Sequence, residues 1–202
     1  MQVIKAERFS QRIALGILRL LGWRVIARDV PEKCMIMGYP HTSNWDFLYF
    51  VLGRASYGVD LSFLAKAEIF RYGAGPILRA LGGIPVDRSA AKGVVGQAVA
   101  QFGQRSSLCL AIAPEGTRKR TALLKSGFYH MTRGANVPLL LATLDYQTRT
   151  VDIGPALVLT GDVTADMDAI RARYAGIKGY RPEQMGVLRL KEEGESTARV
   201  LG

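Results

Sequence analysis

A histidine and an aspartate, His41 and Asp46, are separated by four residues in the segment 36–47, IMGYPHTSNWDF. On one ideal helix, two residues at this spacing would point about 140° apart, so their side chains would not face each other. They can meet only if His41 lies in a turn and Asp46 lies in the first turn of a following helix. Pro40 disfavours helix at the residue before it, and Ser43 can serve as the N-cap. The sequence therefore allows a hydrogen-bonded His–Asp pair.

Such a pair can perform general-base catalysis. A neutral imidazole can remove a proton from a substrate hydroxyl while that oxygen attacks a thioester, and a carboxylate on the other ring nitrogen fixes the tautomer and stabilises the imidazolium that forms. No serine or cysteine nucleophile is required if the acceptor hydroxyl attacks directly. The alternative is that Asp46 only completes a capping box, S-x-x-D, with Ser43, and that His41 is an ordinary surface histidine. These residues alone leave both interpretations open.

A second polar turn follows another apolar run, in the segment 111–118, AIAPEGTR. Gly116 permits close approach of the backbone, Glu115 supplies a carboxylate, and Arg118 supplies a planar donor fork that suits phosphate. The alternative is a solvated basic turn. A third segment, 83–88 (GIPVDR), ends in an Asp-Arg pair, which as a surface ion pair would contribute little to stability.

The remaining histidine and the two cysteines do not indicate a second site. His130 lies inside a predicted helix with no matching acid, so we expect it to be structural. Cys34 and Cys109 lie in the apolar runs CMIMGY and LCLAIA, and we expect both to be buried thiols rather than a disulfide. The histidines and cysteines are not spaced as a zinc site.

Strand-like and helix-like segments alternate along the chain, which predicts one layered α/β domain whose central, mostly parallel or mixed sheet is flanked by helices. The two polar turns are then well placed, because ligands of open α/β sheets bind at the carboxyl ends of the strands. Ser89 is a candidate N-cap and Gly134 a candidate C-cap. The expected strands are 34–39, 61–66, 108–113, 137–144 and 151–159, and the expected helices are 8–23, 44–57, 90–104, 125–133 and 164–175.

The chain of 202 residues is long enough for one domain with its own core. We expect an N-terminal amphipathic helical segment over residues 1–30, the main domain over 31–190, and a polar, loosely ordered tail over 191–202. Within 8–23, apolar residues recur at intervals of three and four with arginines between them. This pattern predicts a helix that packs on the core, lies on a membrane surface, or does both.

The chain is strongly basic, with 27 Lys and Arg against 17 Asp and Glu and a net charge of +10. Such an excess favours polyanions: nucleic acid, an anionic membrane surface or phosphorylated substrates. The basic residues are scattered instead of forming one stripe among exposed aromatics, which argues against nucleic acid as a partner. No apolar run reaches the roughly 18 residues of a membrane span, and no secretory signal pattern follows Met1. We therefore expect a cytoplasmic protein that associates peripherally with the inner face of the membrane.

Three motifs follow one another along the chain: HTSNWD, then GIPVDR, then PEGTR. In this order they resemble the lysophospholipid (glycerolipid) acyltransferase family, whose best-known type is 1-acylglycerol-3-phosphate acyltransferase. The resemblance covers roughly residues 35–145 and includes the family's His-x4-Asp motif, its Gly-rich turn ending in Asp-Arg, its PEGTR motif and its later Val-Pro motif. Each motif is weak alone, whereas the ordered set is specific.

The resemblance implies that His41 is the general base on the acceptor hydroxyl and that Asp46 orients it. The donor would be acyl-CoA or acyl-carrier protein, used as a co-substrate, and the acceptor would be a lysophospholipid, by default 1-acylglycerol-3-phosphate. No metal or redox cofactor would be needed. The residues implied to bind substrate are Arg88, Lys66, Lys125, Glu115, Gly116, Thr117 and Arg118.

The chain also departs from the family pattern. Val137-Pro138 is not followed by a second proline, Trp45 is bulkier than the residue found there in many members, and Pro85 and Val86 replace the more usual pair. These differences leave the identity of the acceptor open. The alternative function is a lipid- or anion-binding protein that has the same fold without catalysis.

Overall fold

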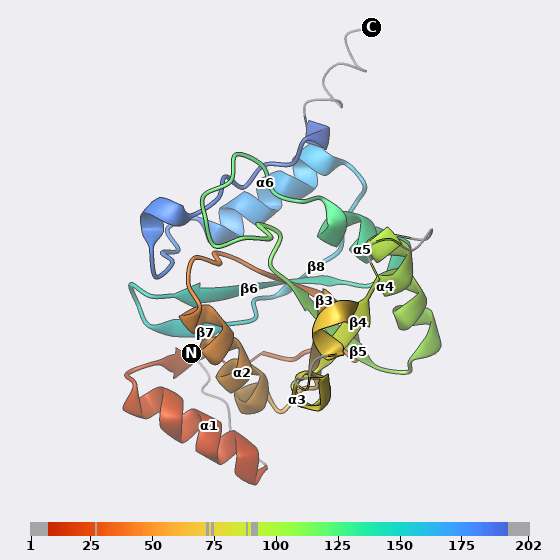
Figure 1. Ribbon diagram of the computed structural model, residues 1–202. Helices are drawn as coiled ribbons and strands as arrows, with labels where there is room; N and C mark the ends of the chain where they lie inside the picture. The colour runs from red at the N-terminus through yellow and green to blue at the C-terminus, as the bar shows by residue number, and fades with distance from the viewer. Residues whose placement is uncertain are drawn as a thin grey trace, which may run out of the picture.

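Within the residues that the computed structural model describes, a mixed sheet of eight strands has helices on both faces (Figure 1). This architecture is the α/β class predicted from the sequence. The strands are β1 (Arg24–Val25), β2 (Lys33–Gly38), β3 (Leu61–Lys66), β4 (Gly83–Val86), β5 (Leu108–Ile112), β6 (Leu139–Asp145), β7 (Thr150–Asp152) and β8 (Ala156–Leu157). The described residues are 8–26, 28–71, 73, 75–87, 89 and 93–193.

The strand order places the two polar turns on adjacent strands. The sheet runs β1-β7-β6-β2-β5-β3-β4, and β2 lies between β6 and β5. The five strands from β6 to β4 are parallel, whereas β7 and β8 pair antiparallel with β6. The carboxyl ends of β6, β2 and β5 therefore meet at one edge of the sheet.

The helices form one layer on each face of the sheet (Figure 1). The helices α4, α5 and α6 cover one face, and α1 and α2 cover the other. The short helices η1 and α3 connect β3 to β4, and η2 lies in the segment that follows α6. Their bounds are α1 (Phe9–Leu20), α2 (Trp45–Tyr57), η1 (Ala67–Phe70), α3 (Gly75–Ala80), α4 (Gly93–Gln104), α5 (Gly127–Ala135), α6 (Val163–Tyr174) and η2 (Pro182–Gln184).

The apolar strands divide their side chains between the two faces of the sheet. On β2, Met35 and Met37 join the cluster beneath α4, α5 and α6, while Cys34 and Ile36 join the cluster on the α2 side. Successive residues of a strand point to opposite faces, and both faces are covered, so the strand is apolar throughout. Cys34 pairs in register with Cys109 of β5, and both are buried free thiols, as predicted.

The predicted strand 151–159 is wrong, because the chain turns within it. β7 ends at Asp152, and the backbone amide of Gly154 donates to the Asp152 carboxylate at 2.9 Å. Gly154 has a φ of 71°, and a Cβ there would lie 2.6 Å from the Leu141 carbonyl oxygen. A side chain is therefore excluded at this turn, and β8 returns to pair with β6.

The predicted helix cap at Gly134 is also wrong. α5 continues past Gly134 to Ala135, and its C-cap is Asn136, which adopts the left-handed conformation with a φ of 51°. Gly134 instead allows α5 to approach α4, since a Cβ there would lie 3.0 Å from Val99. The predicted N-cap Ser89 stays a prediction, because residues 90–92, before the described start of α4 at Gly93, lie outside the described residues. The amide and hydroxyl of Ser89 both donate to the Asp87 carboxylate.

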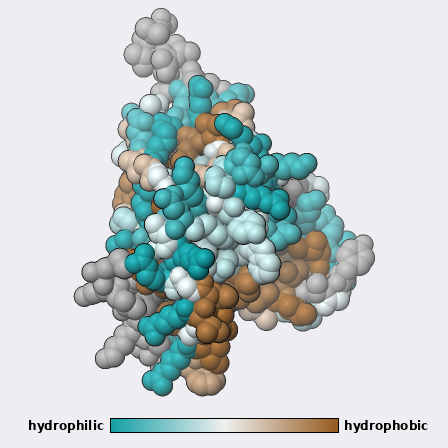
Figure 2. All heavy atoms as spheres, turned by 90° about the vertical axis from the view of Figure 1, so that its left-hand side faces the viewer, coloured by the Kyte–Doolittle hydropathy of each residue, from teal (hydrophilic) through white to brown (hydrophobic). Residues whose placement is uncertain are grey.

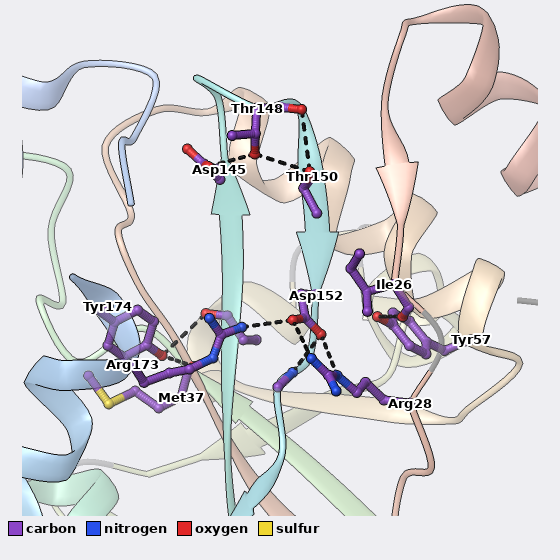
Figure 3. A network of polar contacts seen from close by, with 12 residues as sticks. Ile26, Arg28, Met37, Tyr57, Asp145, Thr148, Thr150, Asp152, Arg173 and Tyr174 are labelled. Atoms are coloured by element: carbon purple, nitrogen blue, oxygen red, sulfur yellow. Dashed lines mark hydrogen bonds and ion pairs between the residues drawn. The ribbon is translucent and has the colours of Figure 1, made fainter. Parts of the chain in front are cut away.

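Asp152 joins three distant parts of the chain at one buried carboxylate (Figure 3). Arg28, in the connection between β1 and β2, donates to it at 3.0 and 3.1 Å, and Arg173 of α6 donates at 2.8 Å. Burial opposes the charge of Asp152, but the hydrogen bonds from Arg28 and Gly154 outweigh it and lower its pKa. This network fixes the N-terminal segment and α6 to the edge of β7.

The amphipathic helix α1 packs on the core and also presents an apolar stripe to solvent. Leu15 and Leu18 are buried in a cluster with Trp23, whereas Phe9 and Leu20 are 78% and 89% exposed. Figure 2 shows a strip of hydrophobic residues beside hydrophilic ones at the lower end of the molecule, where Figure 1 places α1. None of the described helices is long and apolar enough to cross a membrane.

Candidate active site

His41 and Asp46 lie where the chain turns from β2 into α2, and their side chains meet. His41 Nδ1 is 3.2 Å from Asp46 Oδ2. The contact is possible because residues 41–44 form a turn and α2 begins only at Trp45, which places Asp46 in the first helical turn. The local geometry that the spacing required is therefore present.

The Asp46 carboxylate also closes the turn that carries His41. Its Oδ2 accepts the backbone amides of Thr42 at 2.8 Å and Ser43 at 2.9 Å. The capping bond and the contact with His41 thus involve the same oxygen, so the two interpretations of Asp46 are compatible. The N-cap of α2 is Asn44 rather than the predicted Ser43, whose hydroxyl accepts the amide of Trp45 at 3.2 Å.

Tyr146 is a site residue that the sequence analysis missed. It directly follows β6, and its hydroxyl donates to Asp46 Oδ1 at 2.7 Å. Its ring packs edge-on against Trp23, Tyr49 and Tyr180. A polar residue directly after an apolar strand was the available signal, but its meaning depends on β6 being the neighbour of β2, which no local pattern reports.

The contacts of Asp46 favour its anionic form beside the His41 ring. Burial opposes the charge of Asp46, yet the hydrogen bonds from His41, Tyr146 and Ser43 outweigh it and lower its pKa. The His41 side chain is 26% exposed, and its Nε2 has no hydrogen-bond partner in the described part of the chain. This arrangement suits a general base whose outer nitrogen faces a substrate.

Glu115 holds the backbone of the site rather than lining it. The residue is 2% exposed, its Oε2 accepts the amide of His41 at 2.8 Å, and its Oε1 accepts the amide of Gly186 at 3.3 Å. Burial raises the pKa of Glu115 to about 7, against the opposing effect of these two hydrogen bonds. These contacts indicate that Glu115 positions the backbone at His41.

The rest of the PEGTR turn lies on the surface with Lys125 against it. Gly116 has a φ of 64°, and a Cβ there would lie 3.1 Å from Lys125 Cδ, so the lysine side chain crosses directly over the glycine. Thr117 and Arg118 are exposed, and the Thr117 hydroxyl accepts the amide of Lys119 at 3.3 Å. Gly116, Thr117, Arg118 and Lys125 are thus all exposed after β5, the strand next to β2, and Arg118 lines a hollow with Thr42 and Ser43.

Lys66, another predicted binding residue, lies farther along the same edge of the sheet. Lys66 is exposed at the end of β3, which is separated from β2 by β5. Arg88 lies outside the described residues. His130 does face an acid, contrary to expectation, because Glu192 Oε1 is 3.5 Å from its Nε2, and its half-exposed side chain lies on α5. Across the described ranges, no group of three or more His, Cys, Asp or Glu could hold a metal ion.

Two adjoining hollows open beside the turn that carries His41. One is polar, with a volume of about 260 Å³, and the other is almost wholly apolar, with a volume of about 540 Å³. They share Asn44 and Trp45, so together they suit an amphiphilic molecule. The polar hollow is lined by Thr42, Ser43, Asn44, Trp45, Arg118, Tyr180 and Arg181, and the apolar one by Asn44, Trp45, Phe47, Leu48, Val51 and Leu81.

Comparisons with known proteins agree with this geometry. The model of the Acyltransferase family matches residues 23–143, more than half of the chain, and the match includes His41, Asp46 and the PEGTR turn. Among solved structures, the chain is similar to the crystal structure of the 1-acyl-sn-glycerophosphate (LPA) acyltransferase PlsC from Thermotoga maritima. The TM-score is 0.55 at 14% identity, over 81% of this chain and 76% of that chain, which shows a shared fold. A search of the curated proteins found no significant match.

Proposed function

Because the chain belongs to the acyltransferase family, we propose that it moves a fatty acyl group from acyl-CoA or acyl-carrier protein to a hydroxyl of a lysophospholipid acceptor, by default 1-acylglycerol-3-phosphate. The observation that carries the proposal is the 3.2 Å contact between His41 Nδ1 and Asp46 Oδ2. It engages one nitrogen of the ring and leaves the other for the acceptor hydroxyl.

In the proposed reaction, His41 Nε2 takes the proton of the acceptor hydroxyl as that oxygen attacks the thioester carbonyl carbon. The new C–O bond forms, the C–S bond breaks, and the leaving thiolate takes the proton from the imidazolium. His41 is neutral again at the end of the reaction. No atom is oxidised or reduced, so the step needs no redox cofactor. Asp46 stabilises the imidazolium while it exists and keeps the other proton on Nδ1.

The two hollows support an amphiphilic substrate. The polar one is lined by Arg118 and Arg181, whose guanidinium groups suit a phosphate, and the apolar one is lined by Phe47 and Leu48, which suit an acyl chain. Since the hollows meet at Trp45, a molecule with an anionic head and an acyl tail can occupy both. This pairing favours a lysophospholipid over a wholly apolar alcohol.

The proposed place of action is the inner, cytoplasmic face of a membrane, to which the protein binds peripherally. The net charge of +10 favours a surface that carries anionic lipids, and the exposed stripe of α1, with Phe9 and Leu20 at its ends, can enter the boundary between headgroups and acyl chains. Arg12 and Arg19 accompany this stripe on the same helix. The membrane would also hold the acceptor and the product.

The test is the release of free thiol from palmitoyl-CoA, with and without 1-acylglycerol-3-phosphate. Wild type should release thiol only when the acceptor is present, and His41→Ala should reduce the rate by about 10²- to 10⁴-fold. The matched control is His130→Ala, which removes a half-exposed histidine paired with Glu192 and should keep the wild-type rate. A full rate in His41→Ala, with this and other acceptors, would refute the proposal.

The alternative, a binding protein without catalysis, predicts a different result. It requires that the thioester of palmitoyl-CoA and that of acyl-carrier protein both stay intact with every lysolipid, while vesicle binding persists. A panel of phosphorylated and amino-bearing lysolipids with both donors separates this outcome from a wrong choice of donor or acceptor.

A further inference from the structure

The segment after α6 runs back across the site, although it lies beyond the residues that match the family model. We call residues 177–190 the C-terminal strap. The amide of Lys178 donates to Asp145 Oδ1 at the end of β6, and the carbonyl oxygen of Gly186 accepts the hydroxyl of Tyr39 at the end of β2. The amide of Gly186 donates to Glu115 at the end of β5. The strap is thus fastened to the ends of three adjacent strands.

The strap touches the turn that carries the catalytic pair. The amide of Arg181 donates to the hydroxyl of Thr42, the residue after His41, at 3.1 Å. At Gly179, a Cβ would lie 2.8 Å from the same hydroxyl oxygen and 2.9 Å from Pro40 Cγ. The strap therefore passes so close to this turn that only glycine fits, and Arg181 is held next to the site by its own backbone.

Arg181 and Arg118 line the same polar hollow from different parts of the chain. Arg118 belongs to the turn after β5, whereas Arg181 belongs to the strap. Neither guanidinium forms a hydrogen bond or an ion pair with any residue in the described ranges. Two unpaired guanidinium groups around one hollow repel each other and attract an anion that can accept from both.

We propose that Arg181 is an acceptor-binding residue, which holds the phosphomonoester of the acceptor together with Arg118. This inference rests on the proposed function and adds a residue that none of the motifs includes. The hollow, of about 260 Å³, is smaller than the roughly 300–1,000 Å³ of sites that enclose a whole drug-sized ligand, so it suits a headgroup. Beyond Trp45, the apolar hollow takes the acyl chain of the same molecule.

Phosphate groups also occur in the donor, since CoA carries them, and the experiment separates the two sources. KM is measured for 1-acylglycerol-3-phosphate at saturating palmitoyl-CoA, and for palmitoyl-CoA at saturating acceptor. The variants are Arg181→Gln and, as the matched control, Arg189→Gln, an exposed arginine of the same strap that does not line the hollow. A non-phosphorylated 1-monoacylglycerol is tested as a third substrate.

For Arg181→Gln we expect the KM for the phosphorylated acceptor to rise about 10-fold or more, because a hydrogen bond between charged groups is lost. The KM for palmitoyl-CoA and the kcat should stay within about 2-fold, and the preference for the phosphorylated acceptor over 1-monoacylglycerol should fall. Arg189→Gln should match wild type in every measurement.

Two results would overturn the inference while the proposed function stands. A raised KM for palmitoyl-CoA with an unchanged KM for the acceptor would assign the hollow to the donor's phosphates. Unchanged KM values for both substrates would show that Arg181 binds neither. Failure of the wild type to transfer an acyl group to any acceptor would instead overturn the proposed function, and the inference with it.

Discussion

Replacement of Asp46 by asparagine removes a charge from the site while it can preserve the geometry. Asp46 Oδ2 accepts the amides of Thr42 and Ser43, so an amide nitrogen in that position would face two N–H donors. The asparagine oxygen must therefore take the Oδ2 position, where it still accepts from His41 Nδ1. Its NH₂ group then meets the hydroxyl oxygen of Tyr146, which can accept a hydrogen bond. The turn and the tautomer survive in Asp46→Asn, but the imidazolium loses its counter-charge.

The size of the effect follows from the distance between the two charges. Asp46 Oδ2 is 3.2 Å from His41 Nδ1, so the delocalised charges lie about 4 Å apart. At an effective dielectric constant of about 20, two unit charges at that separation attract by about 4 kcal/mol. If this stabilisation acts mainly on the transition state, its loss lowers the rate by about 10³-fold.

The assay is thiol release at saturating donor and acceptor, with Asp166→Asn as the control. Asp166 is also a buried aspartate that accepts a tyrosine hydroxyl, from Tyr129 at 2.7 Å, and two backbone amides, but it lies on α6 and does not contact the dyad. Both variants should lose comparable stability to urea, and only Asp46→Asn should lose kcat by about 10³-fold. A kcat within about 3-fold of wild type in Asp46→Asn would refute the assigned role of the carboxylate.

Three further outcomes are expected. Tyr146→Phe removes the donor to Asp46 Oδ1, so kcat should fall about 10-fold and the acid limb of the pH–rate profile should move to higher pH. The control Tyr49→Phe, which changes a neighbouring ring, should match wild type. Equal pH–rate profiles for the two variants would contradict this role of Tyr146. Burial raises the pKa of Glu115 to about 7, so the native state holds this proton more tightly than the unfolded chain, and the stability it contributes at low pH is lost as pH rises from about 4.5 to 7. Relative to Glu115→Gln, wild type should lose about 3 kcal/mol of unfolding free energy across that window in urea titrations, and a constant difference would exclude the shift. The double change Phe9→Ser and Leu20→Ser should weaken binding to anionic vesicles about 100-fold in a sedimentation assay without affecting thermal stability, whereas unchanged binding would show that α1 is not the anchor.

The sequence by itself determined the chemistry that the turn between β2 and α2 can perform. Pro40 and the residues after it place His41 in a turn and Asp46 in the first turn of α2, and both effects are local steric preferences of the backbone. The alternation of short apolar runs with helical periodicity likewise indicated the α/β class, since strands that are covered on both faces must be apolar throughout. Interactions between residues a few positions apart can be predicted from the sequence, because they depend only on the spacing along one chain segment.

The boundaries that the sequence analysis missed depended on contacts between segments. Gly134 was taken for a helix cap because glycine commonly follows helices, but its position is set by the approach of α5 to Val99 of α4. The run 151–159 reads as one strand, yet it turns at Gly154, where the Asp152 carboxylate receives Arg28, Arg173 and the Gly154 amide. The 3.6-residue pattern of α1 could not say which stripe faces the core, since two stripes on this helix are apolar.

Only the tertiary structure decided which residues complete the site. The hydroxyl of Tyr146 reaches an aspartate 100 positions away, and Glu115 binds the amide of His41 across 74 positions. These contacts exist because the sheet order puts β6 and β5 on either side of β2, so that the ends of three strands meet. Arg181 joins them through a segment with no motif of its own, because the strap is held by the same strand ends. The order of strands in a sheet is set by the packing of the whole chain, and it therefore assembles a site whose parts the sequence lists separately.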